Sequence, residues 1–181
     1  MNDSVRRVAP SLEGLFAEFS PADDCPDYEI VAPADVPEPY HTLLVHEHHM
    51  TVTVEAHHGA PVDVSILARR HNGNHYARKI VLTPQGSQRV VLFGIVRINL
   101  SYCSPAVRDK IVEGKTPLGR ILIEHDVLRR IEISAYLRIR PGPKQLAWFG
   151  LTQPQPFYGR LGFIHCNGKP AVELLEVVVP E

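Results

Sequence analysis

The stretch from Tyr76 to Leu100, YARKIVLTPQGSQRVVLFGIVRINL, decides the fold of this chain. Its two halves, residues 76–83 and 88–100, are rich in Val, Ile and Leu, and the β-branched residues among them favour strands. Between the halves lie Pro84 and Gly86, the residue types that a tight reversal needs. The spacing predicts two neighbouring antiparallel strands.

Upstream of this pair, the sequence continues to alternate. Residues 50–58, MTVTVEAHH, and residues 61–70, PVDVSILARR, are separated by the turn-forming Gly59-Ala60-Pro61. Alternation on both sides of a turn predicts an antiparallel hairpin.

The amino-terminal residues differ in composition from the rest. Leu12, Leu15, Phe16 and Phe19 have the spacing of one short amphipathic helix, which we expect to pack onto the main domain. Residues 21–39 hold five of the 16 prolines among acidic residues, which disfavours helix and predicts an extended connector. We therefore expect an amino-terminal extension over residues 1–40 and one domain over residues 41–181.

Downstream, the hydrophobic period changes near residue 104. Ser104 and Pro105 are typical of a helix start and Gly114 of a helix end, and Thr116-Pro117 repeats the start signal. Further strands are expected in LRRIEISAYLRI (128–139), LAWFGL (146–151), FYGRLGFIHCNGKP (157–170) and AVELLEVVVP (171–180). The predicted fold class is α+β: a mainly antiparallel sheet of roughly six strands, with a few helices at one face or end.

The composition excludes several classes of partner. The 181 residues are 44% hydrophobic and carry a net charge of −1, so there is no general field to attract nucleic acid or an anionic membrane. Three widely spaced cysteines indicate no disulfide framework and no cysteine-rich zinc site. With no signal peptide and no run of about 18 apolar residues, we expect a cytoplasmic protein.

Histidines form the most visible cluster in the sequence: His46, His48, His49, His57, His58, His71 and His75. A metal site needs two or three imidazoles converging from one face, but the zinc-protease spacing HExxH is missed at His46-Glu47. Solvated or hydrogen-bonded histidines are the simpler interpretation, and a histidine-metal enzyme stays as an alternative. No GxSxG, GxGxxG or GxxxxGK[ST] motif is present.

Charged residues inside apolar strands are more informative. Alternation sends Arg78 and Lys79 to opposite faces of the sheet, so one of them should point to the interior. Glu173 and Glu176, three apart in the last strand, also face opposite ways. Either an internal Arg/Glu ion pair or a pocket in which Arg78 holds an anion satisfies this pattern.

A resemblance to a known family rests on five motifs. HHMT (48–51), YARKIVL (76–82), GKTPLGRIL (114–122), FYGRLGFIHCNGKP (157–170) and LLEVVVP (174–180) occur in family order. Over residues 41–180 the chain resembles the chorismate lyase (chorismate pyruvate-lyase) family, which shares its fold with the ligand-binding UTRA domains of certain bacterial regulators. GKTPLGRIL is the most specific match.

The resemblance implies a site. Arg78 would bind the ring carboxylate, helped by backbone groups near Met50 and Leu118, and Glu176 would face the opposite end of the ring as the second catalytic residue. Arg160 would add positive potential toward a second carboxylate. Counting back from Pro180 favours Glu176 over Glu173, whereas counting forward from Gly168-Lys169-Pro170 gives one residue earlier, so a bulge or a slipped register is implied.

The implied reaction eliminates pyruvate from chorismate to leave 4-hydroxybenzoate, a precursor for ubiquinone or aromatic secondary metabolites, with no metal or organic cofactor. The alternative is a non-catalytic sensor or binding protein for a small aromatic acid on the same fold. Compared with the shorter enzymes of the family, the chain carries its amino-terminal extension and a long segment over residues 134–156. These additions leave the substrate open, and the sequence indicates no oligomeric state.

Overall fold

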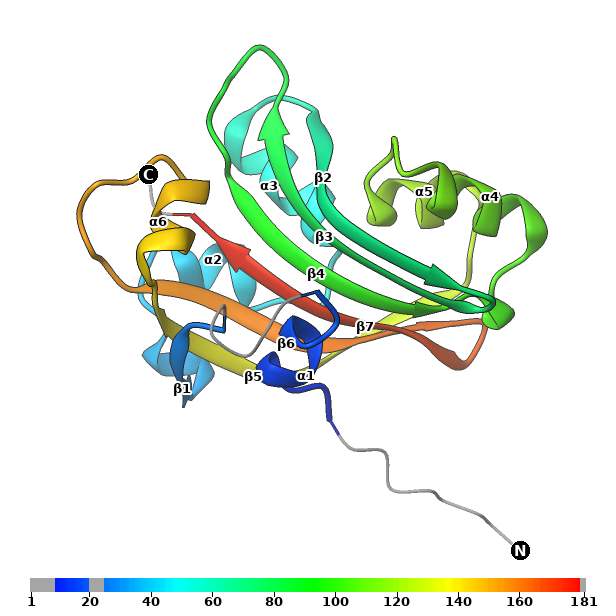
Figure 1. Ribbon diagram of the computed structural model, residues 1–181, viewed down its shortest axis with the longest axis horizontal. Coiled ribbons are helices and arrows are strands. Elements are labelled where there is room, and N and C mark those ends of the chain that lie inside the picture. The colour runs from blue at the N-terminus through cyan, green and yellow to red at the C-terminus, as the bar shows by residue number, and fades with distance from the viewer. Residues whose placement is uncertain (1–8, 20–24, 180–181) are drawn as a thin grey trace, which may run out of the picture.

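Figure 1 shows the computed structural model of the chain, which describes residues 9–19 and 25–179. The described residues form one antiparallel sheet of seven strands in the order β1-β5-β6-β7-β4-β3-β2. The predicted α+β class is confirmed, with one strand more than the six expected. The strands are β1 (Asp27–Val31), β2 (Val62–Asn72), β3 (His75–Pro84), β4 (Leu92–Asn99), β5 (Arg129–Arg140), β6 (Phe157–Cys166) and β7 (Lys169–Val178).

Six α-helices and two 3-10 turns accompany these strands in the described residues. The helix predicted after residue 104 is present: the Ser104 Oγ accepts a hydrogen bond from the Val107 amide, and Gly114 ends the helix at a φ of 78°. The helices are α1 (Leu12–Phe16), α2 (Tyr40–Leu44), α3 (Met50–His58), α4 (Pro105–Glu113), α5 (Leu118–Glu124) and α6 (Pro143–Trp148), and the 3-10 turns are η2 (Pro33–Asp35) and η3 (Leu100–Tyr102).

Two predicted strands are helices. Residues 50–58 form α3, because Met50, Thr51 and Val54 are buried together on one helical face and Gly59 ends the helix in the left-handed region. Packing of this face outweighs the strand preference of the alternating Thr and Val residues. Residues 143–148 form α6, begun by Pro143 at the first helical position, so the strand expected at 146–151 is also wrong.

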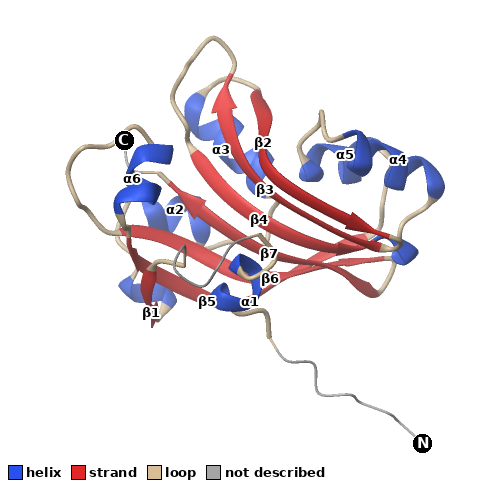
Figure 2. Ribbon diagram, viewed as in Figure 1, coloured by secondary structure: helices blue, strands red, loops and turns tan. Residues whose placement is uncertain are grey.

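The helices lie on both faces of the sheet, which corrects the expectation that they occupy one face or end (Figure 2). One face packs against α1 and against Phe149, which follows α6. The other face packs against α2 and α3 at one end and against α4 and α5 at the other. The interior strand β4 carries buried apolar residues on both sides, so each face needs a cover.

The described part of the amino-terminal segment belongs to the same fold. Leu12, Leu15 and Phe16 of α1 are buried in the core, as the helical spacing predicts. Asp27–Val31, in the predicted connector, pairs with β5 as an edge strand. The strand itself contains no proline, and Pro26 and Pro33 lie on either side of it.

A β-bulge fixes the register of the last strand. Ile164 pairs with Val172 but His165 pairs with Pro170, so Ala171 is the extra residue on β7. This is the bulge that the two ways of counting to the glutamate imply. It sets Glu176 opposite Arg160 on one neighbour and opposite Gly94 on the other.

Among the residues that the structure describes, none of the helices has the length and apolar character that a bilayer crossing requires.

Candidate ligand-binding cavity

A small cavity lies between the sheet and the starts of α3 and α5. Arg78 of β3 and Glu176 of β7 both line it, together with Met50 at the start of α3 and Leu118 at the start of α5. Four of the five predicted site residues are therefore brought together. The apolar lining from the sheet includes Val64, Ile80, Leu82, Leu92, Val96 and Leu174.

The two charged residues occupy opposite corners of the cavity floor. Arg78 pairs with Val96, which in turn pairs with Leu174, whereas Glu176 lies two residues further along β7. Their Cα atoms are two strands apart across the sheet and two residues apart along it. With ideal sheet spacings, this corresponds to a separation of about 12 Å. The floor between them is apolar.

Arg78 is buried without an anionic partner in the described part of the chain. Its side chain is 2% exposed, and its only hydrogen bond runs from Nη2 to the Thr116 carbonyl at 3.4 Å. Nε and Nη1 are enclosed and make no hydrogen bond, and neither does the neighbouring Tyr76 hydroxyl. Burial lowers the pKa of Arg78, although the Tyr76 hydroxyl acts in the opposite direction.

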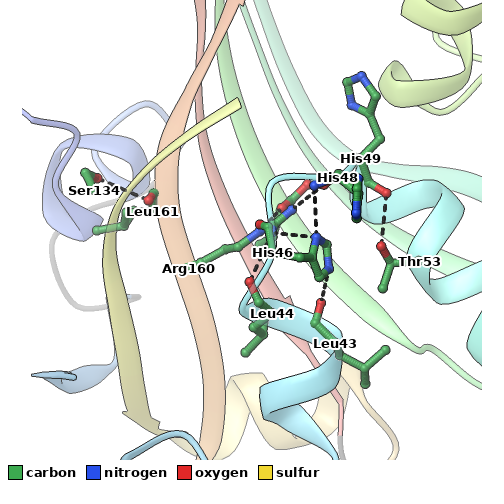
Figure 3. Close-up of polar contacts among 10 residues, drawn as sticks. Leu43, Leu44, His46, His48, His49, Thr53, Ser134, Arg160 and Leu161 are labelled. Carbon is green, nitrogen blue, oxygen red and sulfur yellow. Dashed lines mark hydrogen bonds and ion pairs between the residues drawn. The ribbon is translucent and has the colours of Figure 1, made fainter. Parts of the chain in front are cut away.

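Glu176 is already neutralised by the protein. Its Oε2 accepts a hydrogen bond from Arg160 Nε at 2.7 Å. Arg160 is fully buried and does not line the cavity, and Figure 3 shows its side chain reaching toward Leu44, His46 and His48. Its remaining nitrogens donate to the carbonyls of Leu44, His46 and His48, in the segment that joins α2 to α3.

His49 and Gly94 also line the cavity, and the sequence did not single them out for it. His49 is 8% exposed and its Nε2 is enclosed without a partner. Burial and the cations Arg129 and Arg160 lower its pKa to about 4, so the ring is neutral at pH 7. Gly94 leaves space on the floor between Ile80 and Glu176. No sequence signal marks either residue, because both act through strand register and the placement of α3.

The opposite face of the sheet is arranged differently. Lys79 is 7% exposed, so both Arg78 and Lys79 are buried, whereas only one of them was expected to point inward. The reason is that helices cover both faces. Glu173 lies on this face, opposite to Glu176 as predicted, and binds Arg97, which also contacts Glu18 at 3.1 Å.

The histidines do not converge on a metal site. Within residues 9–19 and 25–179, no group of three His, Cys, Asp or Glu side chains is placed to hold a metal ion. His46 and His48 stack on each other, with ring centroids 5.5 Å apart, and His57 contacts His58 edge to face. The hydrogen-bonded interpretation of this cluster fits its geometry.

Comparisons with known proteins give the fold. No protein-family model and no curated protein sequence matches the chain. Among solved structures it is similar to the ligand-binding domain of a Bordetella bronchiseptica protein assigned to the GntR family of transcriptional regulators, with a TM-score of 0.50 and 12% identity over 66% of this chain and 86% of that one. The effector domain of PhnF from Mycobacterium smegmatis gives a TM-score of 0.50 and 13% identity over 72% and 87% of the two chains.

These findings correct the predicted activity. The similar structures are effector and ligand-binding domains of transcriptional regulators, so the prediction of a chorismate pyruvate-lyase is wrong. The geometry gives a physical reason, because the Glu176 carboxylate that would assist proton transfer is held in an ion pair with Arg160. What the likeness shows is the fold that UTRA domains share with chorismate lyases.

Proposed function

We propose that this chain is a small-molecule binding domain whose cavity accepts an anion with an apolar body, as a sensor rather than as an enzyme. The observation that carries the proposal is Arg78, a buried guanidinium with two unpartnered nitrogens beside an apolar cavity. The effector-domain role of the two similar structures supports the sensor interpretation.

The energetic argument concerns the cost of Arg78. An unsatisfied buried donor costs about 1–3 kcal/mol, and more when the group is charged. Stable folds neutralise such a group with a carboxylate, as this chain does for Arg97 and for Arg160. A ligand carboxylate, sulfonate or phosphonate would supply the missing partner, because a planar guanidinium binds such oxygens through parallel hydrogen bonds.

The cavity size restricts the ligand. Its volume is about 50 Å³, whereas an apolar cavity that admits benzene is about 150 Å³. A ligand with one ring or a short branched chain therefore fits only if the lining moves outward. Met50, which lines the cavity, is unbranched and can change shape at small cost.

The test is binding of ring-sized anions. Benzoate, benzenesulfonate and phenylphosphonate are titrated into the protein by calorimetry at pH 7.5, with neutral benzamide as the matched probe. We expect at least one anion to bind, benzamide to bind at least tenfold more weakly, and Arg78→Met to abolish the difference. Arg97→Met is the control, because Arg97 lies on the other face. Equal binding of anions and benzamide, or unchanged anion binding by Arg78→Met, would contradict the proposal.

A further inference from the structure

The segment of residues 44–51, from the last residue of α2 to the first turn of α3, forms one wall of the cavity, and its position depends on Arg160, which lies outside the cavity lining. It ends in His49, Met50 and Thr51, which line the cavity. The start of α3 has no side-chain cap of its own. The segment is held instead by Arg160, which donates to three of its carbonyls at 2.8–3.1 Å.

We infer that Arg160, His46 and Glu176 are positioning residues for this wall, and that the arrangement holds only while His46 is neutral. The effect on ligand affinity rests on the function proposed above, whereas the effect on the wall itself does not.

The hydrogen bonds of His46 fix its tautomer. Its Nε2 lies 2.7 Å from the Leu43 carbonyl, which can only accept, so Nε2 carries the proton. Its Nδ1 lies 3.0 Å from the His48 amide nitrogen and 3.4 Å from Arg160 Nη1, and both of these groups can only donate. Nδ1 is therefore the bare acceptor. A proton added to Nδ1 would meet two donors and remove both contacts.

The charges around His46 act in the same direction. Arg160 of β6 faces it directly, and the ring of His48 stacks on it from its own segment. The carboxylate of Glu176 on β7 is bound on the far side of Arg160. Burial first, and then Arg160, lower the pKa of His46 below its usual value of 6.5.

The sign of the pH effect follows from this lowering. When the segment is released from Arg160, His46 takes up a proton at its ordinary pKa, whereas its pKa is lowered while the segment is held. The held state is therefore favoured most above pH 6.5 and loses stability as the pH falls below that value. His49 lies in the same segment and its pKa is also lowered, to about 4, so its proton uptake on opening adds a fall over the same range that all three proteins compared below share.

The start of α3 packs closely against the start of α5, so a movement of the wall changes the shape of the cavity. A Cβ placed on Gly119 of α5 would lie 2.9 Å from Thr51 Oγ1 and 3.2 Å from His49 Cβ, so the starts of α3 and α5 touch at this point. Release of the segment that precedes His49 therefore changes two sides of the cavity together.

The experiment compares three proteins without ligand: wild type, His46→Asn and His48→Asn. Asparagine at position 46 puts an acceptor oxygen near the place of Nδ1 and does not titrate, whereas His48→Asn removes a neighbouring imidazole and leaves His46 intact. Amide exchange of residues 46–51 is measured by nuclear magnetic resonance at pH 7.5 and 5.5, after correction for the intrinsic pH dependence of exchange.

We expect protection of these amides to fall at pH 5.5 by at least threefold more in wild type and His48→Asn than in His46→Asn, because one imidazole with an ordinary pKa of 6.5 can contribute at most about tenfold between these two pH values. Constant protection in wild type, or an equal fall in His46→Asn, would overturn the inference. Imidazole nitrogen shifts at pH 7.5 should show the Nε2-protonated tautomer of His46, and the other tautomer would also overturn it.

Ligand binding then separates this inference from the proposed function. Benzenesulfonate, whose charge is constant over this range, should lose more affinity between pH 7.5 and pH 5.5 in wild type than in His46→Asn. If none of the ring-sized anions binds at either pH, the proposed function fails, and the amide-exchange result still decides the role of His46.

Discussion

Replacing Arg78 by Met should stabilise the protein and abolish anion binding. The substitution removes a buried charge with two unpartnered nitrogens and keeps an unbranched side chain that can fill the space. Relief of two unsatisfied donors is worth about 2–6 kcal/mol at about 1–3 kcal/mol each. Loss of the 3.4 Å bond to the Thr116 carbonyl costs about 1 kcal/mol. The net gain of about 1–5 kcal/mol overlaps the roughly 1–4 kcal/mol seen when buried ion pairs are replaced by apolar residues.

Thermal unfolding followed by circular dichroism checks this prediction. For a chain of this length, 1 kcal/mol corresponds to about 2–4 °C in Tm, so a gain of about 2 kcal/mol raises Tm by about 4–8 °C. Arg97→Met is the matched control, because it removes the cation that binds Glu173 and one of the two groups that contact the Glu18 carboxylate, and it should lower Tm. A lower Tm for Arg78→Met would mean that Arg78 has a structural partner, and would refute the reasoning that assigns it to a ligand.

Three further predictions concern single sites. Gly94→Val should keep or raise Tm, because an added Cβ meets only ordinary contacts at 3.4–3.5 Å, but weaken binding of benzenesulfonate at least tenfold by filling the cavity floor, as calorimetry would show. Gly114→Ala should lower the free energy of unfolding in urea by about 1–2 kcal/mol, since its φ is 78° and its Cβ would lie 2.6 Å from Ile66. Because burial raises the pKa of Cys166 to about 11, this thiol should resist iodoacetamide at pH 8 and react only in urea, with mass spectrometry as the assay.

Most of the fold could be predicted because its signals are local. Ser104, Pro105 and Gly114 act on the backbone beside them, so the bounds of α4 follow from the sequence. The pairing of β3 with β4 follows in the same way from apolar strands around a Pro/Gly turn. Even the bulge at Ala171 was implied, because two motifs at the ends of one strand disagreed by one residue.

The errors arose where distant contacts decide the local structure. Thr51 to Thr53 alternates with Val as a strand does, yet residues 50–58 are helical because Met50 and Val54 share an apolar environment with β3 and β7. The burial of Lys79 could not be foreseen for a similar reason. It depends on α1 and the residues after it, with Phe19 lying 5.6 Å from the Lys79 ammonium.

For the candidate site, the positions of the charged residues could be predicted, but not the residues with which they pair. Alternation along a strand puts Arg78 and Lys79 on opposite faces, and likewise the two glutamates of β7, without saying which face is the cavity side. The family resemblance selects Arg78 and Glu176, which both line the cavity. Neither says whether a charge meets a counter-ion. Arg160 and Arg78 have the same kind of sequence context, an arginine inside an apolar strand, but the register sets Arg160 opposite Glu176 and leaves Arg78 opposite Val96. One arginine thereby becomes part of the scaffold and the other remains available to a ligand.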